Sequence, residues 1–202
     1  MRLGIEHFFA PVSGYAYLGH VALLLAARKN GAIVRQRPVD IARVFAAGGS
    51  TPPVRQSDAR RAWRRRDMRL WATQRALPLN EQPKHWPTDG ELAARAIIAL
   101  DMAGGPVDAF VGAVLGAVWA RDLDIADRDV LAGLLTEAGV DAKATLLRAD
   151  GDEAAASYES NTQDAIAAGV FGSPTYRIGD ELFFGQDRLE FVQAALERAA
   201  SA

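Results

Sequence analysis

Residues 169–188 constrain the fold of this chain more than any other stretch. A proline, Pro174, precedes two short apolar runs at 175–178 and 182–184. A Gly-Asp pair separates the runs, and it favours a tight hairpin because glycine tolerates a positive φ and aspartate bonds its own backbone. The stretch therefore predicts a loop and a β-hairpin in direct succession.

A terminal helix should follow this hairpin. Asp187 stands where a helix N-cap belongs, and Glu190 follows three residues later, which is the spacing of a capping box.

Most X-Pro bonds are trans, but Pro174 lies between a helical segment and the first strand of a hairpin, a context that favours the cis form. On this context, rather than on the dipeptide itself, we expect a cis bond between Ser173 and Pro174.

The N-terminal residues predict a βαβ unit. Residues 3–9 are rich in strand formers, and apolar side chains recur at helical spacing over 17–28. Asn30-Gly31 ends that helix, and residues 33–38 form a second short strand. A strand–helix–strand unit of this kind is parallel and right-handed.

Between the two ends, from residue 40 to about 158, the apolar pattern has the period of helices. The economical architecture is an α/β, thioredoxin-like fold (βαβ…ββα) with a large all-helical insertion. We expect a discontinuous thioredoxin-like domain, 1–39 and 159–202, and a helical insertion domain, 40–158. The helix signals are the pattern at 60–77, a Thr88…Glu91 capping box, Pro106 as a first helical residue, and caps at Asp127 and Asp141.

Composition excludes several classes of function. The chain has 202 residues, a formal net charge of -2 and no cysteine. This charge argues against nucleic acid as the main partner. The sequence contains no stretch of about 18 uncharged apolar residues, so we expect no membrane span. Without cysteine there is neither a disulfide nor the Cys-x-x-Cys redox pair that a thioredoxin fold often carries. The N-terminus resembles a strand rather than a signal peptide, so we expect a cytoplasmic protein.

Ser13 lies in the loop between the first strand and the first helix. Ligands bind at the carboxyl ends of strands in open α/β sheets, and a helix N-terminus favours an anion such as a thiolate. Alternatively, Ser13 only caps the helix or stabilises a turn. The histidines at His7, His20 and His85 are scattered, which predicts core or surface residues and neither a metal site nor a catalytic relay. Because a serine without a base is unactivated, its hydroxyl is better suited to donating to another molecule's thiolate.

Two further segments could bind charged groups. Residues 60–69 carry six arginines, with Trp63 and Trp71 interleaved. They could form a solvated helix face, a carboxylate site, or a nucleic-acid patch, the last weakened by the acidic balance of the chain. Gln186 and Asp187 could hold an α-amino-acid group, with Asp187 pairing its ammonium, or Asp187 could cap the last helix.

Several motifs resemble those of the 2-hydroxychromene-2-carboxylate isomerases and the related kappa-class glutathione transferases. The resemblance covers the whole chain, and it is most specific near the C-terminus. Residues 13–19 are similar to the active loop of that family, residues 161–166, 169–175 and 184–189 to its C-terminal signature, and residues 49–53, 66–71 and Trp86-Pro87 to weaker motifs.

The resemblance implies a glutathione-dependent isomerase. Such an enzyme interconverts 2-hydroxychromene-2-carboxylate and trans-o-hydroxybenzylidenepyruvate in aromatic hydrocarbon degradation, through transient addition of the glutathione thiolate. By the same resemblance, Ser13 would stabilise the thiolate, and Ser173, before Pro174, would pair with the tripeptide backbone. The γ-glutamyl end would be held by Gly185, Gln186, Asp187 and Arg188.

The resemblance is less close around the organic substrate. Ser50 and Arg60 stand where the family has asparagine and lysine, and Trp86 where it has an aromatic residue near the substrate. Arg60 would then orient the substrate carboxylate, and Trp86 would stack on its ring. Gly14 replaces a proline of the active loop.

Two other functions stay open. A kappa-type glutathione transferase or peroxidase would use the same thiolate on electrophiles or hydroperoxides, and a non-catalytic thioredoxin-like binding module would fit the missing cysteines. The partners that we expect are glutathione and an aromatic small-molecule carboxylate, with no nucleic acid, membrane or metal. The family is commonly dimeric, which implies a homodimer.

Overall fold

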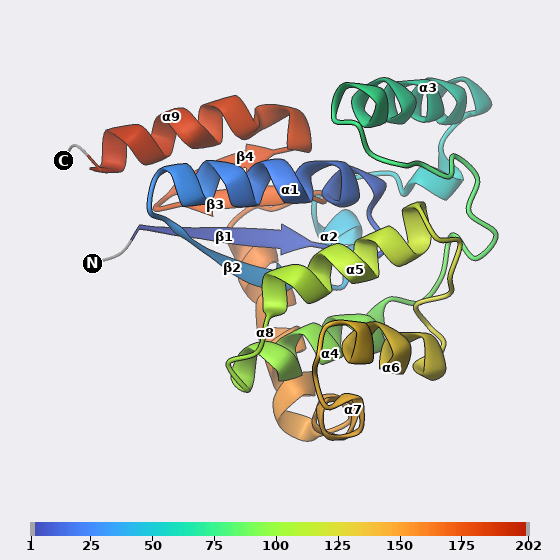
Figure 1. Ribbon diagram of the computed structural model, residues 1–202. Coiled ribbons are helices and arrows are strands. Elements are labelled where there is room, and N and C mark those ends of the chain that lie inside the picture. Colours follow the sequence, from blue (N-terminus) through green and yellow to red (C-terminus); the bar gives the residue numbers. More distant parts are fainter. Residues whose placement is uncertain (1–2, 201–202) are drawn as a thin grey trace.

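A mixed sheet of four strands lies at the centre of the protein, whose computed structural model describes residues 3–200 (Figure 1). Its strands are β1 Gly4–Phe9, β2 Ile33–Pro38, β3 Thr175–Ile178 and β4 Glu181–Phe184. The spatial order is β2-β1-β3-β4; β1 and β2 run parallel, and β3 is antiparallel to both β1 and β4. The two ends of the chain therefore pair at the centre of the sheet, as predicted.

The hairpin that was predicted between the last two strands is present. Gly179 adopts a φ of 57° in the two-residue turn between β3 and β4. This left-handed conformation is one that glycine adopts at little cost. The turn sets the register in which Ile178 faces Glu181, and Tyr176 faces Phe183.

The expected helical segments are also formed. Asp127 and Asp141 accept hydrogen bonds from the backbone N–H groups of Asp129 and Ala144, and so cap their helices. In chain order the helices are α1 Gly14–Lys29, α2 Ile41–Ala47, η1 Pro53–Arg55, α3 Asp58–Gln74, α4 Glu91–Met102, α5 Val107–Trp119, α6 Arg128–Glu137, α7 Ala142–Ala149, α8 Asp152–Ala167, η2 Gln186–Arg188 and α9 Leu189–Ala200.

Helices cover both faces of the sheet (Figure 1). On the face of α1 and α9, Leu23 and Val192 pack with Tyr176 of β3. On the opposite face, Ala165 of α8 packs with Phe8 of β1. The largest core cluster joins α1 to α4, α5, α6 and α7, so α1 packs against the helical part as well as against the sheet. The division into two domains remains a prediction, and α8 runs without a break past residue 158.

Two predicted caps are wrong, and Pro106 is the N-cap of α5 rather than its first helical residue. Thr88 does not cap α4, because Gly90 occupies the N-cap position and the Thr88 hydroxyl donates to the Asp124 carboxylate at 2.5 Å. Asp187 does not occupy an N-cap either, because it lies inside the 3-10 turn η2 that leads into α9. This leaves its carboxylate free of a capping role.

The three histidines occupy core and surface positions, as expected. His7 and His20 are buried, and His85 is exposed with its Nδ1 atom 3.7 Å from an Asp124 oxygen. His20 Nε2 lies 2.8 Å from the carbonyl oxygen of Asp108. Within residues 3–200, no group of three or more His, Asp or Glu side chains is placed to hold a metal ion.

His7 is fully buried in the sheet between two aromatic rings. Its ring stacks on Phe9 and Tyr176 at centroid distances of 4.5 and 5.3 Å. Its Nδ1 atom lies 2.8 Å from Gln36 Oε1, whereas its Nε2 has no hydrogen-bond partner among the described residues. Burial lowers the pKa of His7 to about 3, so the ring is neutral at physiological pH.

This buried ring predicts acid sensitivity. Between pH 6.5 and about 3, His7 is protonated in the unfolded state and neutral in the folded state. The free energy of unfolding therefore falls as the pH falls through this window. The loss is about 1.4 kcal/mol per pH unit. We expect the unfolding free energy of the wild type to fall about 2 kcal/mol further than that of His7→Asn between pH 7.5 and 5, measured by urea denaturation. An identical pH dependence in the two proteins would contradict this origin of the sensitivity.

Candidate functional site

Ser13 is placed by the start of α1. It is the N-cap residue, and its Oγ accepts a hydrogen bond from the backbone N–H of Ala16 at 3.2 Å. The first turn of α1 holds no acidic side chain, so nothing on that turn neutralises the positive end of the helix dipole. A cap and an anion-binding position therefore coincide at one hydroxyl.

The same hydroxyl connects the two ends of the chain. Ser13 Oγ donates to the backbone carbonyl of Ser173 at 3.2 Å. In return, the Ser173 hydroxyl accepts a hydrogen bond from the backbone N–H of Ala10 at 2.9 Å. The predicted cis bond between Ser173 and Pro174 is present. The two serines singled out from the sequence are thus brought face to face.

The turn Gly185–Arg188 lies next to this pair. The Gly185 N–H donates to the carbonyl of Pro174 at 2.9 Å, which ties the turn to the proline loop. Gly185 adopts a φ of 101° and a ψ of 143°, a region that essentially only glycine occupies. As the first residues of a helical turn, Gln186 and Asp187 carry N–H groups with no partner inside the helix.

An arginine fastens this turn to α1. Arg75 donates to the backbone carbonyls of Leu18 and Gln186, the latter at 3.2 Å. The Gln186 side chain is buried, and a Cβ on Gly19 of α1 would lie 2.8 Å from its Cβ. The Gln186 Oε1 atom has no hydrogen-bond partner within residues 3–200. Asp187 is more exposed, and its carboxylate lies 3.7 Å from the Arg188 guanidinium.

A pocket of about 360 Å³, here called the basic pocket, adjoins the Ser13 loop. Its aromatic wall is fixed to that loop, because the indole N–H groups of Trp86 and Trp119 both donate to the Val12 carbonyl at 3.2 Å. The side chains that give the pocket its character are Arg61, Arg64, Arg65, Glu81, Trp86 and Trp119. A ligand in this pocket would lie beside whatever binds at Ser13.

The residues expected around the organic substrate are only partly brought together. Trp86 lines the basic pocket, and its role in stacking on a substrate ring stays a prediction. Arg60 is exposed and does not line it; Arg64, one helical turn further along α3, does. Ser50 instead donates to the Phe171 carbonyl at 2.9 Å and so supports the segment before Ser173.

Trp119 and Arg75 were not predicted from the sequence, and Arg64 was predicted only as one of six arginines in a possible carboxylate site. Arg64 and Trp119 belong to the basic pocket, and Arg75 holds the turn at Gln186. The alternation of arginine and tryptophan over 60–71 indicated the right segment. It could not indicate which arginine faces the pocket, because that depends on how α3 packs against α1.

The structure also explains why Gly14 departs from the family pattern. A Cβ at this position would overlap the methyl group of Met68 and approach the Trp119 ring to 3.0 Å. Gly14 is buried at the first position of α1, between these two side chains. Met68 and Trp119 therefore occupy the space that a larger residue would need.

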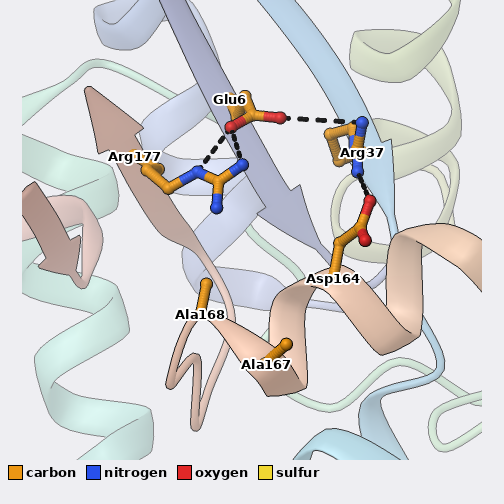
Figure 2. A pocket seen from close by; sticks show the side chains of 6 residues that line it. All are labelled: Glu6, Arg37, Asp164, Ala167, Ala168 and Arg177. Atoms are coloured by element: carbon orange, nitrogen blue, oxygen red, sulfur yellow. Dashed lines mark hydrogen bonds and ion pairs between the residues drawn. The ribbon is translucent and has the colours of Figure 1, made fainter. Parts of the chain in front are cut away.

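A second pocket, of about 470 Å³, lies between the sheet and α8, and neither Ser13 nor Ser173 lines it (Figure 2). Its charged groups pair with one another: Glu6 binds Arg177 and Arg37, and Arg37 also binds Asp164. Both arginines also lie over the Phe8 ring. With its charges balanced internally, this pocket is not the candidate site.

No helix within residues 3–200 is both long and apolar enough to cross a membrane.

Comparison with known proteins gives a family model and relatives that align with nearly the whole chain. The family model described as DSBA-like thioredoxin domain matches residues 4–197. A 2-hydroxychromene-2-carboxylate isomerase of Sphingobium xenophagum is 30% identical over 197 residues, covering 97% of this chain and 99% of that protein. One from Pseudomonas putida is 29% identical over 198 residues, covering 96% and 94%.

Solved structures share the fold. A structure of 2-hydroxychromene-2-carboxylate isomerase superposes with a TM-score of 0.81 and 26% identity, covering 98% of this chain and 96% of that one. The cytosolic disulfide reductase DsbM from Pseudomonas aeruginosa with GSH gives a TM-score of 0.71 at 21% identity, covering 99% and 100%. The likeness to DsbM shows a common fold alone.

Proposed function

The chain belongs to the DSBA-like thioredoxin domain family, alongside the 2-hydroxychromene-2-carboxylate isomerases, and from that premise we propose that it is a glutathione-dependent isomerase. Its reaction would interconvert 2-hydroxychromene-2-carboxylate and trans-o-hydroxybenzylidenepyruvate. The observation that carries the proposal is the Ser13 hydroxyl, placed at the N-terminus of α1 and facing the Ser173 carbonyl. Since the chain has no cysteine, the reactive sulfur has to come from a bound molecule.

Ser13 can change its acceptor when that sulfur arrives. A hydroxyl hydrogen rotates about its C–O bond, so the donor that now points at the Ser173 carbonyl can turn to a thiolate. A hydrogen bond to a charged acceptor is stronger than one to a neutral carbonyl. The released Ser173 carbonyl would then accept an N–H from the tripeptide backbone.

The surroundings of Ser13 favour a negative charge. The positive end of α1 lowers the pKa of a nearby thiol, as it does for cysteines at helix N-termini. Tyr15, two residues further on, donates its hydroxyl to Asp67 at 2.8 Å. Burial and this hydrogen bond raise the pKa of Tyr15, so its ring stays neutral and does not oppose a thiolate.

The turn at 185–188 suits the γ-glutamyl end of glutathione. The N–H groups of Gln186 and Asp187 would receive its carboxylate, as helix N-termini do for anions. The Asp187 carboxylate, which caps no helix, would pair with its ammonium group. Arg188 would lie next to the γ-glutamyl end. Arg75 keeps the turn in place because its side chain donates a hydrogen bond to the Gln186 carbonyl.

Bound glutathione would supply a nucleophile that adds to a conjugated carbon of the chromene, permits rotation about the resulting single bond, and leaves again. The protein's own part is to hold the organic acid in the basic pocket beside Ser13. The half-buried Trp86 ring offers a stacking surface, and the arginines of α3 offer positive charge. Orientation of the two reactants accounts for much of such a rate enhancement.

Glutathione binding tests this proposal directly. We expect reduced glutathione to raise the melting temperature in a concentration-dependent manner, and the saturated protein to isomerise 2-hydroxychromene-2-carboxylate. A protein that binds glutathione and acts on 1-chloro-2,4-dinitrobenzene but not on the chromene would be a transferase. No thermal shift with glutathione would leave the non-catalytic binding module as the better account.

A further inference from the structure

Arg64 is a largely buried cation without a counter-charge. Within residues 3–200 its guanidinium forms no ion pair and donates no hydrogen bond to another residue. Three aromatic rings surround it instead, those of Tyr15, Trp86 and Trp119, at 5.4, 5.2 and 5.5 Å from the guanidinium carbon to the ring centroids. Burial lowers the pKa of Arg64, which reflects the cost of holding this charge without an anionic partner.

The remaining charges of the basic pocket are already engaged or lie in solvent. Glu81 accepts two hydrogen bonds from Arg69, each 2.6 Å long, so its carboxylate is not available to Arg64. Arg61 binds Asp58 and donates to two backbone carbonyls. Arg65 is exposed. The pocket therefore carries an excess of positive charge, and Arg64 is its most buried source.

The way in which Arg64 is held leaves its hydrogen-bonding edge usable. Cation–π contacts engage the flat face of a guanidinium, whereas its N–H donors lie in the plane and match the two oxygens of a carboxylate. The three rings hold the side chain, and its N–H donors have no hydrogen-bond partner within residues 3–200. The half-buried Trp86 ring supplies apolar surface next to those donors, and the buried Trp119 ring, tilted by 54° at a centroid distance of 5.6 Å, supports it from behind.

We propose that Arg64 is a specificity-determining residue, which binds the carboxylate of a flat aromatic acid whose ring packs against Trp86. The carboxylate and the ring are recognised by side chains of different segments, so the pocket selects molecules that carry both groups. The aromatic nature of the acid rests on the proposed isomerase function. The requirement for a carboxylate rests on the charge of the pocket alone.

The test compares two ligands of the same shape, trans-cinnamate and trans-cinnamamide. We expect the full-length wild type, in isothermal titration without glutathione, to bind the acid roughly 10- to 100-fold more tightly than the neutral amide. Arg64→Gln should abolish this preference. Arg64→Lys, which retains the charge but not the planar fork, should keep a smaller one. Arg66→Gln removes an exposed arginine of the same helix and is the matched control, which should retain the full preference.

Glutathione affinity, measured on the same proteins, separates this inference from the proposed function. Arg64→Gln should bind glutathione as the wild type does, which also verifies that the variant is folded. A wild type that prefers cinnamate but does not bind glutathione would support the role of Arg64 and reject the isomerase. Equal binding of acid and amide by the wild type, or an undiminished preference in Arg64→Gln, would overturn the role of Arg64.

Discussion

Replacing Ser13 with alanine should lower the rate of glutathione-dependent isomerisation about 100-fold, the order of magnitude seen when one donor to a developing anion is removed. The hydroxyl is the side-chain donor that the structure places between the N-terminus of α1 and the Ser173 carbonyl. Without it the bound thiol would ionise less readily at neutral pH. Steady-state turnover of the chromene at saturating glutathione is the measurement.

A matched variant separates this chemical role from a loss of stability. Ser13 also caps α1, and removal of a cap costs about 1 kcal/mol. Asp141 caps α7 through the N–H of Ala144 in the same manner, at a helix remote from Ser13. Asp141→Ala should therefore lower the melting temperature about as much as Ser13→Ala and leave turnover unchanged. Similar activity losses in the two variants would indicate that Ser13 acts only as a cap.

Gly185→Ala should raise the KM for glutathione about tenfold with a smaller change in kcat. At a φ of 101° and a ψ of 143°, a residue with a Cβ is strained by roughly 1–3 kcal/mol. An added Cβ would also overlap an oxygen of the Asp187 carboxylate. The strain is relieved by a shift of the turn and the overlap by rotation of the Asp187 side chain, and both changes would displace groups proposed to bind the γ-glutamyl end. About 1.4 kcal/mol of lost binding corresponds to the tenfold change.

Gly179→Ala provides the control for backbone strain. Gly179 also has a positive φ, of 57°, but no atom lies within 4 Å of the place where its Cβ would be. It lies at the tip of the hairpin, whereas Gly185 bonds directly to the proline loop. We expect Gly179→Ala to lose about 1 kcal/mol of stability and to keep the wild-type KM. A KM that rises equally in both variants would show that general strain, rather than the position of the turn, weakens glutathione binding.

The sheet and the Ser13–Ser173 pair could be predicted because their signals are local. A glycine at the hairpin turn, a proline before β3, and a serine at the start of α1 each restrict the backbone within a few residues. The pairing of β1 with β3 follows once the two ends of the chain are recognised as halves of one fold. These parts of the site depend little on how distant helices pack.

The basic pocket could not be predicted in the same way. Arg64, Trp86 and Trp119 come from α3, a loop and α5, and they meet through tertiary packing. On α3 six arginines look alike in sequence, and Arg60 does not line the pocket, whereas Arg61, Arg64 and Arg65 do. Sequence patterns fix the period of a helix, but not its rotation against its neighbours.

The two misplaced caps have related physical causes. The sequence around Asp187 satisfies a capping-box pattern, but the chain enters α9 through a 3-10 turn that begins earlier, at Gln186. Thr88 has a suitable spacing from Glu91, but its hydroxyl finds a carboxylate, Asp124, from a distant part of the chain. At both places groups outside the short motif decide the conformation: the Asp124 carboxylate for Thr88, and the turn that begins at Gln186 for Asp187.

The most direct measurement is the pKa of the glutathione thiol bound to the wild-type protein, followed through its ultraviolet thiolate absorbance during a pH titration. If the Ser13 hydroxyl and the end of α1 stabilise a borrowed sulfur, the bound thiol will titrate at least one pH unit below free glutathione, a shift of about 1.4 kcal/mol. A bound thiol that titrates like free glutathione would contradict the account.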